Sequence, residues 1–305
     1  MENRYDFADL GEVADLRWVR HMEGREAASG TVSLPAIPPG ARVPVTLPDA
    51  ALGAATAGET WLDLSVRTRR ADALLEAGHE LGFAQFHLGG NWSPPSPDAD
   101  SGTLSLEETA SGIRLSGTGW DMRFSRETGG LDSWKVGGRE LLQAGPSPDF
   151  WRAPTDNDRG AGLALTGERL PGRERALDAS IVWSGAAGSW KPAEPEVDHA
   201  GDAATLRFAG PILEGRASVE LVYRVSASGE LSVNFHYAAS TALPMLPRVG
   251  TRWILPADLQ QVEWYGRGPD PTYADRRFEP VGRHQTTVME NWVDYSRPQE
   301  NGNKV

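Results

Sequence analysis

The stretch Trp61-Leu62-Asp63-Leu64-Ser65-Val66 alternates apolar and polar side chains without interruption. Because successive side chains of a β-strand point to opposite faces, this alternation predicts a strand with one buried face and one wet face. Similar short runs lie on both sides of it, separated by turn signals such as Pro-Pro-Gly and Pro-Asp. Their spacing is typical of an immunoglobulin-like β-sandwich of about 100 residues. The expected strands are 14–21, 28–34, 42–47, 60–67 and 80–87.

A segment rich in glycine and proline follows these strands. It reads Gly89-Gly90-Asn91-Trp92-Ser93-Pro94-Pro95-Ser96-Pro97-Asp98. The glycines permit a turn, and the prolines favour an extended spacer. The sequence therefore predicts a first domain at 1–90, a linker at 91–102 and a second domain at 103–305.

Short apolar runs resume after the linker and predict a larger antiparallel β-sandwich, so the expected fold class is all-β. No run in this part shows a helical period. The stretch 143–175 is expected to be a long irregular loop, and such loops often serve in binding or as lids. The expected strands are 113–115, 120–124, 131–136, 140–142, 179–183, 204–208, 217–225, 231–237, 249–255 and 262–265.

Composition excludes several classes of function. The chain has no Cys, which rules out disulfide frameworks and Cys nucleophiles. A net charge of -12 disfavours binding to nucleic acid and to anionic membranes, which require basic surface. The first 20 residues contain neither a signal peptide nor an apolar span, so a cytoplasmic location is expected. The 11 Trp residues suit stacking on sugars, but most Trp residues of a sandwich fill its core.

The long loop contains most of the chemically interesting side chains, in the stretch DFWRAPTDNDRG at 149–160. Asp156 and Asp158 alternate as calcium ligands do, but the fifth and twelfth positions of such a loop are Gly160 and Gly167, which offer no side-chain oxygen. No metal site is therefore expected. Arg152 is expected to pair with a carboxylate, while Asp and Asn side chains bond to the loop backbone.

The segment FWRAPTDNDRG (150–160) resembles the opening signature of the small-chain domain of β-galactosidases, in the large glycoside hydrolase family that includes the bacterial lactose-cleaving enzyme. Three further segments agree in order and spacing: ENRYDF at 2–7, EWYGRGP at 263–269 with Tyr273 to Asp275-Arg276, and the YxxPQENG-like run at 295–302. Asp270-Pro271-Thr272 departs from the usual acidic residue and Asn at that place. The resemblance implies an immunoglobulin-like domain followed by a galactose-mutarotase-like supersandwich.

The resemblance also implies what this chain lacks. In the family, both catalytic glutamates and the magnesium and sodium ligands lie in a barrel that precedes this region. We therefore expect no catalytic residue, metal ligand or cofactor here, and we expect the second domain to be incomplete. The implied partners are β-galactosides and the catalytic barrel and N-terminal domains of the same enzyme, which is expected to be a homo-oligomer.

The resemblance places residues 156–160 in a loop that borders the family's active-site mouth, and the alternative for them is a loop that only buttresses the domain interface. One expectation is a stacked aromatic and arginine cluster held by cation–π contact, and core and interface packing is the other; the cluster would comprise Trp264, Tyr265, Arg267 and Tyr273. The candidate rim residues are Asp156, Asn157, Asp158, Arg159 and Gly160, the loop anchors are Trp151 and Arg152, and the secondary candidates are Trp264, Arg267, Tyr273, Glu300 and Asn301.

Three other functions stay open. A mutarotase-like sugar enzyme would need an acid and a base, for which His236 and His284 are the available histidines of the second part. A stand-alone carbohydrate-binding module would show exposed Trp. The small subunit of a split β-galactosidase would start near Leu104 and end with a complete domain, which this chain does not match.

Overall fold

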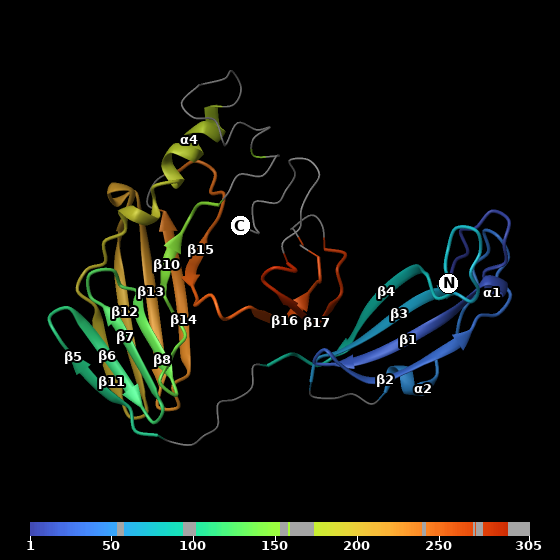
Figure 1. Cartoon of the computed structure of the whole chain (residues 1–305). Coiled ribbons are helices and arrows are strands. Elements are labelled where there is room, and N and C mark those ends of the chain that lie inside the picture. The colour runs from blue at the N-terminus through green and yellow to red at the C-terminus, as the bar shows by residue number, and fades with distance from the viewer. Residues whose placement is uncertain are drawn as a thin grey trace. The chain divides into compact units, whose positions relative to one another are not determined.

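The structure is a computed structural model, and it describes residues 1–53, 58–93, 102–152, 158, 174–239, 242–270, 272 and 277–291. The chain divides into two compact units. The first comprises Met1–Pro95 and Gln261–Thr287, and the second comprises Ser96–Gln260 and Val288–Val305. Antiparallel sheets build both units, which confirms the expected all-β class (Figure 1).

The first unit is built on a four-stranded antiparallel sheet with the order β2-β1-β3-β4. The alternating stretch Trp61 to Val66 lies in β3, and its Leu62 is buried with Trp18 and Ala51. At the start of the sheet, Asp9 caps a short helix and its carboxylate also accepts from the Ile37 N–H at 2.8 Å. The elements are α1 (Leu10–Val13), β1 (Ala14–Met22), β2 (Arg25–Ser33), α2 (Asp49–Leu52), β3 (Thr60–Thr68) and β4 (Glu80–Gly89).

A hairpin from far along the chain belongs to the same unit. It consists of β16 (Gln261–Arg267) and β17 (Val281–Thr287), which pair antiparallel with Tyr265 opposite Arg283. The first unit is therefore discontinuous in sequence.

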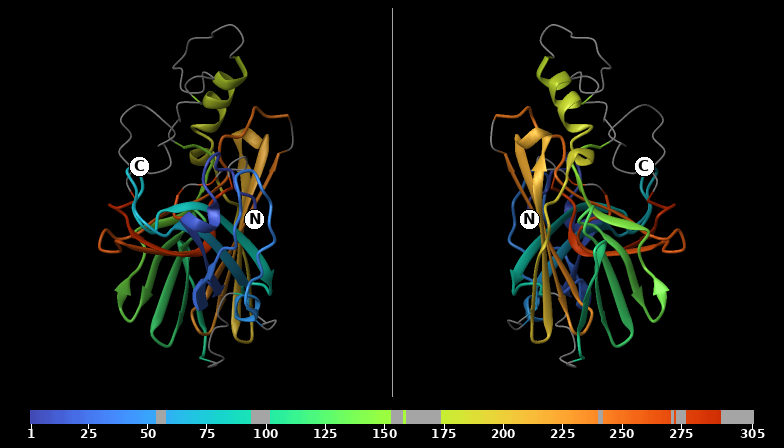
Figure 2. Two further views of the ribbon diagram at one scale, coloured as in Figure 1. Left: turned by 90° about the vertical axis from the view of Figure 1, so that its right-hand side faces the viewer. Right: turned by 90° about the vertical axis from the view of Figure 1, so that its left-hand side faces the viewer.

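The second unit is a sandwich of a five-stranded and a four-stranded sheet, coloured green and yellow to orange in Figures 1 and 2. Strand β10 pairs with β15 beside them. The elements are β5 (Ser105–Glu108), β6 (Gly112–Gly117), β7 (Trp120–Ser125), β8 (Leu131–Val136), β9 (Arg139–Glu140), β10 (Ala144–Asp149), α4 (Glu174–Trp183), β11 (Glu196–Ala200), β12 (Ala203–Ile212), β13 (Ala217–Ser226), β14 (Leu231–Ala239) and β15 (Gly250–Ile254), with short 3-10 turns at Ala187–Ser189 and Leu213–Gly215.

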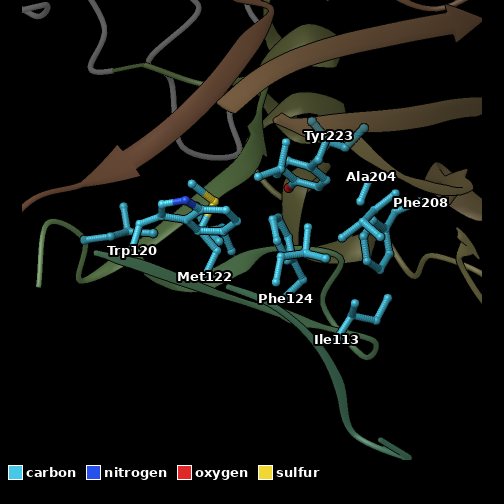
Figure 3. Close-up of a cluster of buried hydrophobic side chains, with 13 residues drawn as sticks. Ile113, Trp120, Met122, Phe124, Ala204, Phe208 and Tyr223 are labelled. Atoms are coloured by element: carbon cyan, nitrogen blue, oxygen red, sulfur yellow. The ribbon is translucent and has the colours of Figure 1, made fainter. Parts of the chain in front are cut away.

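The core of this sandwich comes from side chains that alternate along facing strands. Figure 3 shows Met122 and Phe124 of β7 gathered with Phe208 of β12 and Tyr223 of β13. The Tyr223 hydroxyl donates to the Gly129 carbonyl at 2.7 Å, and burial raises the pKa of this phenol. Its one polar group is thus satisfied inside an apolar core.

Three expectations about secondary structure are wrong. Residues 179–183 form the end of helix α4, not a strand, because Ala179 and Trp183 are buried one turn apart while Ile181 is exposed. The segment 42–47 forms only an isolated bridge between Glu2 and Arg42, since Pro44 and Pro48 cannot donate to a ladder. Part of the expected loop 143–175 is strand β10, whose Ala-Gly-Pro-Ser-Pro-Asp composition reads as a turn.

Candidate functional site

The loop signature starts at a buried aromatic anchor. Phe150 follows β10 directly and has no exposed surface. Its ring lies 5.7 Å from that of Trp183 on α4, and 5.5 Å and 6.3 Å from those of Tyr237 and Phe235 on β14. Trp151 packs on the same cluster. Rings at these separations contribute to stability beyond their buried area, so the start of the signature is held firmly.

An ion pair follows this anchor. Both terminal nitrogens of Arg152 donate to the carboxylate of Asp158, Nη2 to Oδ1 at 3.1 Å and Nη1 to Oδ2. This confirms that Arg152 pairs with a carboxylate and shows that the partner is a residue of the signature itself. At the base, the Asp149 carboxylate accepts from the Trp151 N–H at 3.3 Å and lies 3.5 Å from Arg248. The two-point contact thus links Arg152 to Asp158, the geometry in which an arginine binds a carboxylate most strongly.

The strength of this link can be measured by a double-mutant cycle on Arg152 and Asp158. Both side chains are mostly buried, so we expect a coupling of about 1–3 kcal/mol in urea unfolding of the Ala variants. The exposed pair Arg139–Asp258 is the matched control, with a coupling expected below about 0.5 kcal/mol. Equal couplings in the two cycles would contradict a stabilising role for the Arg152–Asp158 pair.

Several candidates lie outside the described residues. Of the five rim candidates, only Asp158 is among the described residues. The other four are Asp156, Asn157, Arg159 and Gly160, and the secondary candidates Tyr273, Glu300 and Asn301 also lie outside the described residues.

The two described secondary candidates have roles inside their hairpin. Trp264 stacks on His284 with ring centroids 5.1 Å apart, and its indole N–H donates to the Arg267 carbonyl at 3.1 Å. Arg267 in turn donates to the carbonyls of Arg277 and Glu279. Among the described residues, Arg283 lies over an aromatic ring, with its guanidinium carbon 6.0 Å from the centroid of Tyr265. The described contacts of Trp264 and Arg267 are therefore ring packing and hydrogen bonds to the backbone.

Sequence reasoning missed a group of polar side chains where the hairpin meets the first sheet. Gln85 of β4 bonds to the backbone of Val281, and the Tyr265 hydroxyl donates to Glu59 Oε2 at 2.5 Å. Burial and the Glu59 carboxylate raise the pKa of Tyr265. These partners are separated by 196 and 206 residues, so no local pattern could have pointed to them.

The open alternatives gain little support from the described residues. His236 is exposed on β14, and His284 packs on Trp264. Among the Trp residues that the structure describes, Trp92 alone is exposed, at 44%. Across the described ranges, no three His, Asp or Glu side chains converge as metal ligands do, and no helix is long and apolar enough to cross a membrane.

Comparison with known proteins gives two family matches that follow one another along the chain. The family described as "Beta-galactosidase, domain 4" matches residues 1–89, and the family described as "Beta galactosidase small chain" matches residues 116–305. The boundary between the two matches falls around the glycine and proline-rich segment.

Curated relatives point the same way. A beta-galactosidase of Actinobacillus pleuropneumoniae is 28% identical over 99% of this chain and 29% of its own length. One of Arthrobacter sp. (strain B7) is 31% identical over 97% of the chain and 29% of its length. "Beta-galactosidase BgaC" of Bifidobacterium adolescentis is 32% identical over 81% of the chain and 23% of its length. The chain thus spans roughly a quarter of the length of these relatives.

Proposed function

The chain belongs to the β-galactosidase small-chain family, and on that premise we propose that it is a non-catalytic part of a β-galactosidase that hydrolyses terminal β-galactosyl residues. The observation that carries the proposal is the pair of ordered family matches, together with relatives named beta-galactosidase that align over nearly the whole chain but with less than a third of their own length. The catalytic carboxyls, in this proposal, lie in the remainder of the enzyme.

The role proposed for this chain is to frame the substrate site. A loop that borders a site contributes through geometry, by orienting the substrate and excluding water. The signature at 150–160 suits such a role because Phe150 anchors its start and Arg152 pairs with Asp158. We propose that residues 156–160 form part of this rim.

The proposal assigns no metal ion to this chain. Retaining glycoside hydrolysis requires two carboxyl groups roughly 5 Å apart, one as nucleophile and one as acid and base. The magnesium and sodium sites that the family resemblance implies are proposed to lie in the barrel of the whole enzyme. Those ions, a homo-oligomeric assembly and a cytoplasmic location belong to the proposed whole enzyme.

Two measurements test the proposal. The coding sequence that adjoins this one is expected to encode, in frame, a barrel that supplies the carboxyl pair. The purified 305-residue chain is expected to show no turnover of a chromogenic β-galactoside above a mock preparation, because it lacks that pair. Hydrolysis by the chain that persists through further purification and is abolished by heat denaturation would overturn the non-catalytic role.

A further inference from the structure

The hairpin β16–β17 meets the first sheet through Gln85, whose side-chain amide pairs with the backbone of β17. The N–H of Val281 donates to Gln85 Oε1 at 2.8 Å, and the carbonyl of Val281 accepts from Gln85 Nε2 at 2.9 Å. A primary amide offers the same donor and acceptor pair as a peptide group. Gln85 therefore satisfies one donor and one acceptor of the β17 edge as a neighbouring strand would.

A carboxylate determines which way this amide faces. The second proton of Gln85 Nε2 goes to Asp63 Oδ1 at 2.8 Å, and Asp63 lies directly opposite Gln85 in the β3–β4 register. Asp63 Oδ2 lies 3.0 Å from His21 Nε2 on β1. A flipped amide would direct its oxygen at the carboxylate and at the Val281 carbonyl, which is unfavourable. Asp63, the polar residue in the middle of the alternating stretch of β3, thus orients Gln85.

Two further contacts hold the hairpin, one at the turn between β1 and β2 and one at Glu59, directly before β3. Arg283 Nε donates to the Glu23 carbonyl at 3.1 Å, while the Tyr265 hydroxyl is bound by Glu59. Gly24 adopts a φ of +73°, and a Cβ there would lie 2.7 Å from Arg283 Cγ and 2.9 Å from Tyr265 Cδ2. Only glycine permits this approach without displacement. The hairpin is thus fitted closely to the first sheet at more than one point.

We infer that Gln85 is a positioning residue that docks the β16–β17 hairpin on the first sheet, with Asp63 as the group that orients its amide. The docked hairpin carries the family segment EWYGRGP, so the first unit sets the place of that segment. Any effect of this docking on galactoside hydrolysis rests on the proposed function. The docking itself is independent of it.

Gln85→Glu in the full chain provides the sharpest test. When the introduced carboxyl group is protonated, it offers one O–H donor and one acceptor, so it can still bond to Val281. In its charged form it would face both Asp63 and the Val281 carbonyl. Two adjacent carboxyls raise the pKa of one of them. We therefore expect the Val281 amide to keep most of its protection from hydrogen exchange at about pH 5 and to lose about tenfold or more by about pH 8.

Other titratable groups near this position must be separated from the effect. They are His21 beside Asp63, His87 two residues along β4, and Arg283 two residues along β17. All three are present in the unaltered chain, whose protection factor at Val281, corrected for intrinsic exchange, provides the baseline at each pH.

Two variants complete the design. Gln285→Glu is the matched control, since Gln285 also donates to a carboxylate, that of Glu263, but within the hairpin itself. It is expected to leave the protection of Val281 unchanged at both pH values. Gln85→Met keeps the size of the side chain without its amide and is expected to lower the protection at both.

Each result of these exchange measurements either supports or overturns the role of Gln85. Recovery of protection at low pH in Gln85→Glu shows that the variant folds and that the amide position controls docking. Unchanged protection in Gln85→Met, or the same pH response in Gln285→Glu, would overturn the inference. Since no galactoside is involved, this result is separate from the success or failure of the proposed function.

Discussion

Replacement of Phe150 by alanine is expected to lower the free energy of unfolding of the second unit by about 3–5 kcal/mol, the range for truncating a buried phenylalanine. The ring has no exposed surface and is surrounded by Trp183, Tyr237 and Phe235. Its removal leaves a cavity between helix α4 and strand β14 that rigid strands cannot close. Urea unfolding, followed by circular dichroism and by Trp fluorescence, measures the change.

The same variant is expected to loosen the loop signature. Phe150 lies two residues before Arg152, which pairs with Asp158. Without the buried ring, the backbone that positions Arg152 for this pair is expected to be more mobile. Hydrogen exchange of the amides at 151–152 is expected to rise more than that of β12 and β13. Ile181→Ala is the control, because Ile181 lies on the same helix as Trp183 but is 65% exposed, and a change within about 0.5 kcal/mol is expected. An equal loss of stability in both variants would show that the aromatic cluster is not the anchor.

Local pattern predicted those elements whose burial follows the strand period. The stretch Trp61 to Val66 lies in β3, and 120–124 and 217–225 lie in β7 and β13. The pattern failed where a short segment was compatible with both the strand period and the helix period. At 179–183, Ala179 and Trp183 are compatible with either, and only the exposure of Ile181 identifies a helix.

The candidate site was predictable to the extent that its partners are near in sequence. Arg152 could be expected to find a carboxylate because several lie within seven residues of it, and Asp158 is the one it binds. Gln85 and Val281 are separated by 196 residues, and a glutamine in a strand gives no signal of a tertiary bond. Contacts of that kind depend on the fold as a whole.

The segment ENRYDF at 2–7 shows how a family motif can have a structural cause. Asn3 is 1% exposed. Its Nδ2 donates to the carbonyls of Ala8 and Ile37 at 2.8 Å and 2.7 Å, and its Oδ1 accepts from the Tyr5 N–H at 2.9 Å. One side chain thus serves three backbone groups from two separate segments, which explains why an amide is needed at this position.

Asn3→Ala is accordingly expected to lower the free energy of unfolding of the first unit by about 2–4 kcal/mol, because it leaves buried backbone groups without their partner. Asn3→Asp is expected to be no better, since a carboxylate cannot donate to the Ala8 and Ile37 carbonyls. Arg4→Ala, at an exposed neighbouring position, is expected to change stability by less than about 0.5 kcal/mol. If Asn3→Asp matched the unaltered chain, the two donated bonds would contribute nothing, and the motif would need a cause outside this unit.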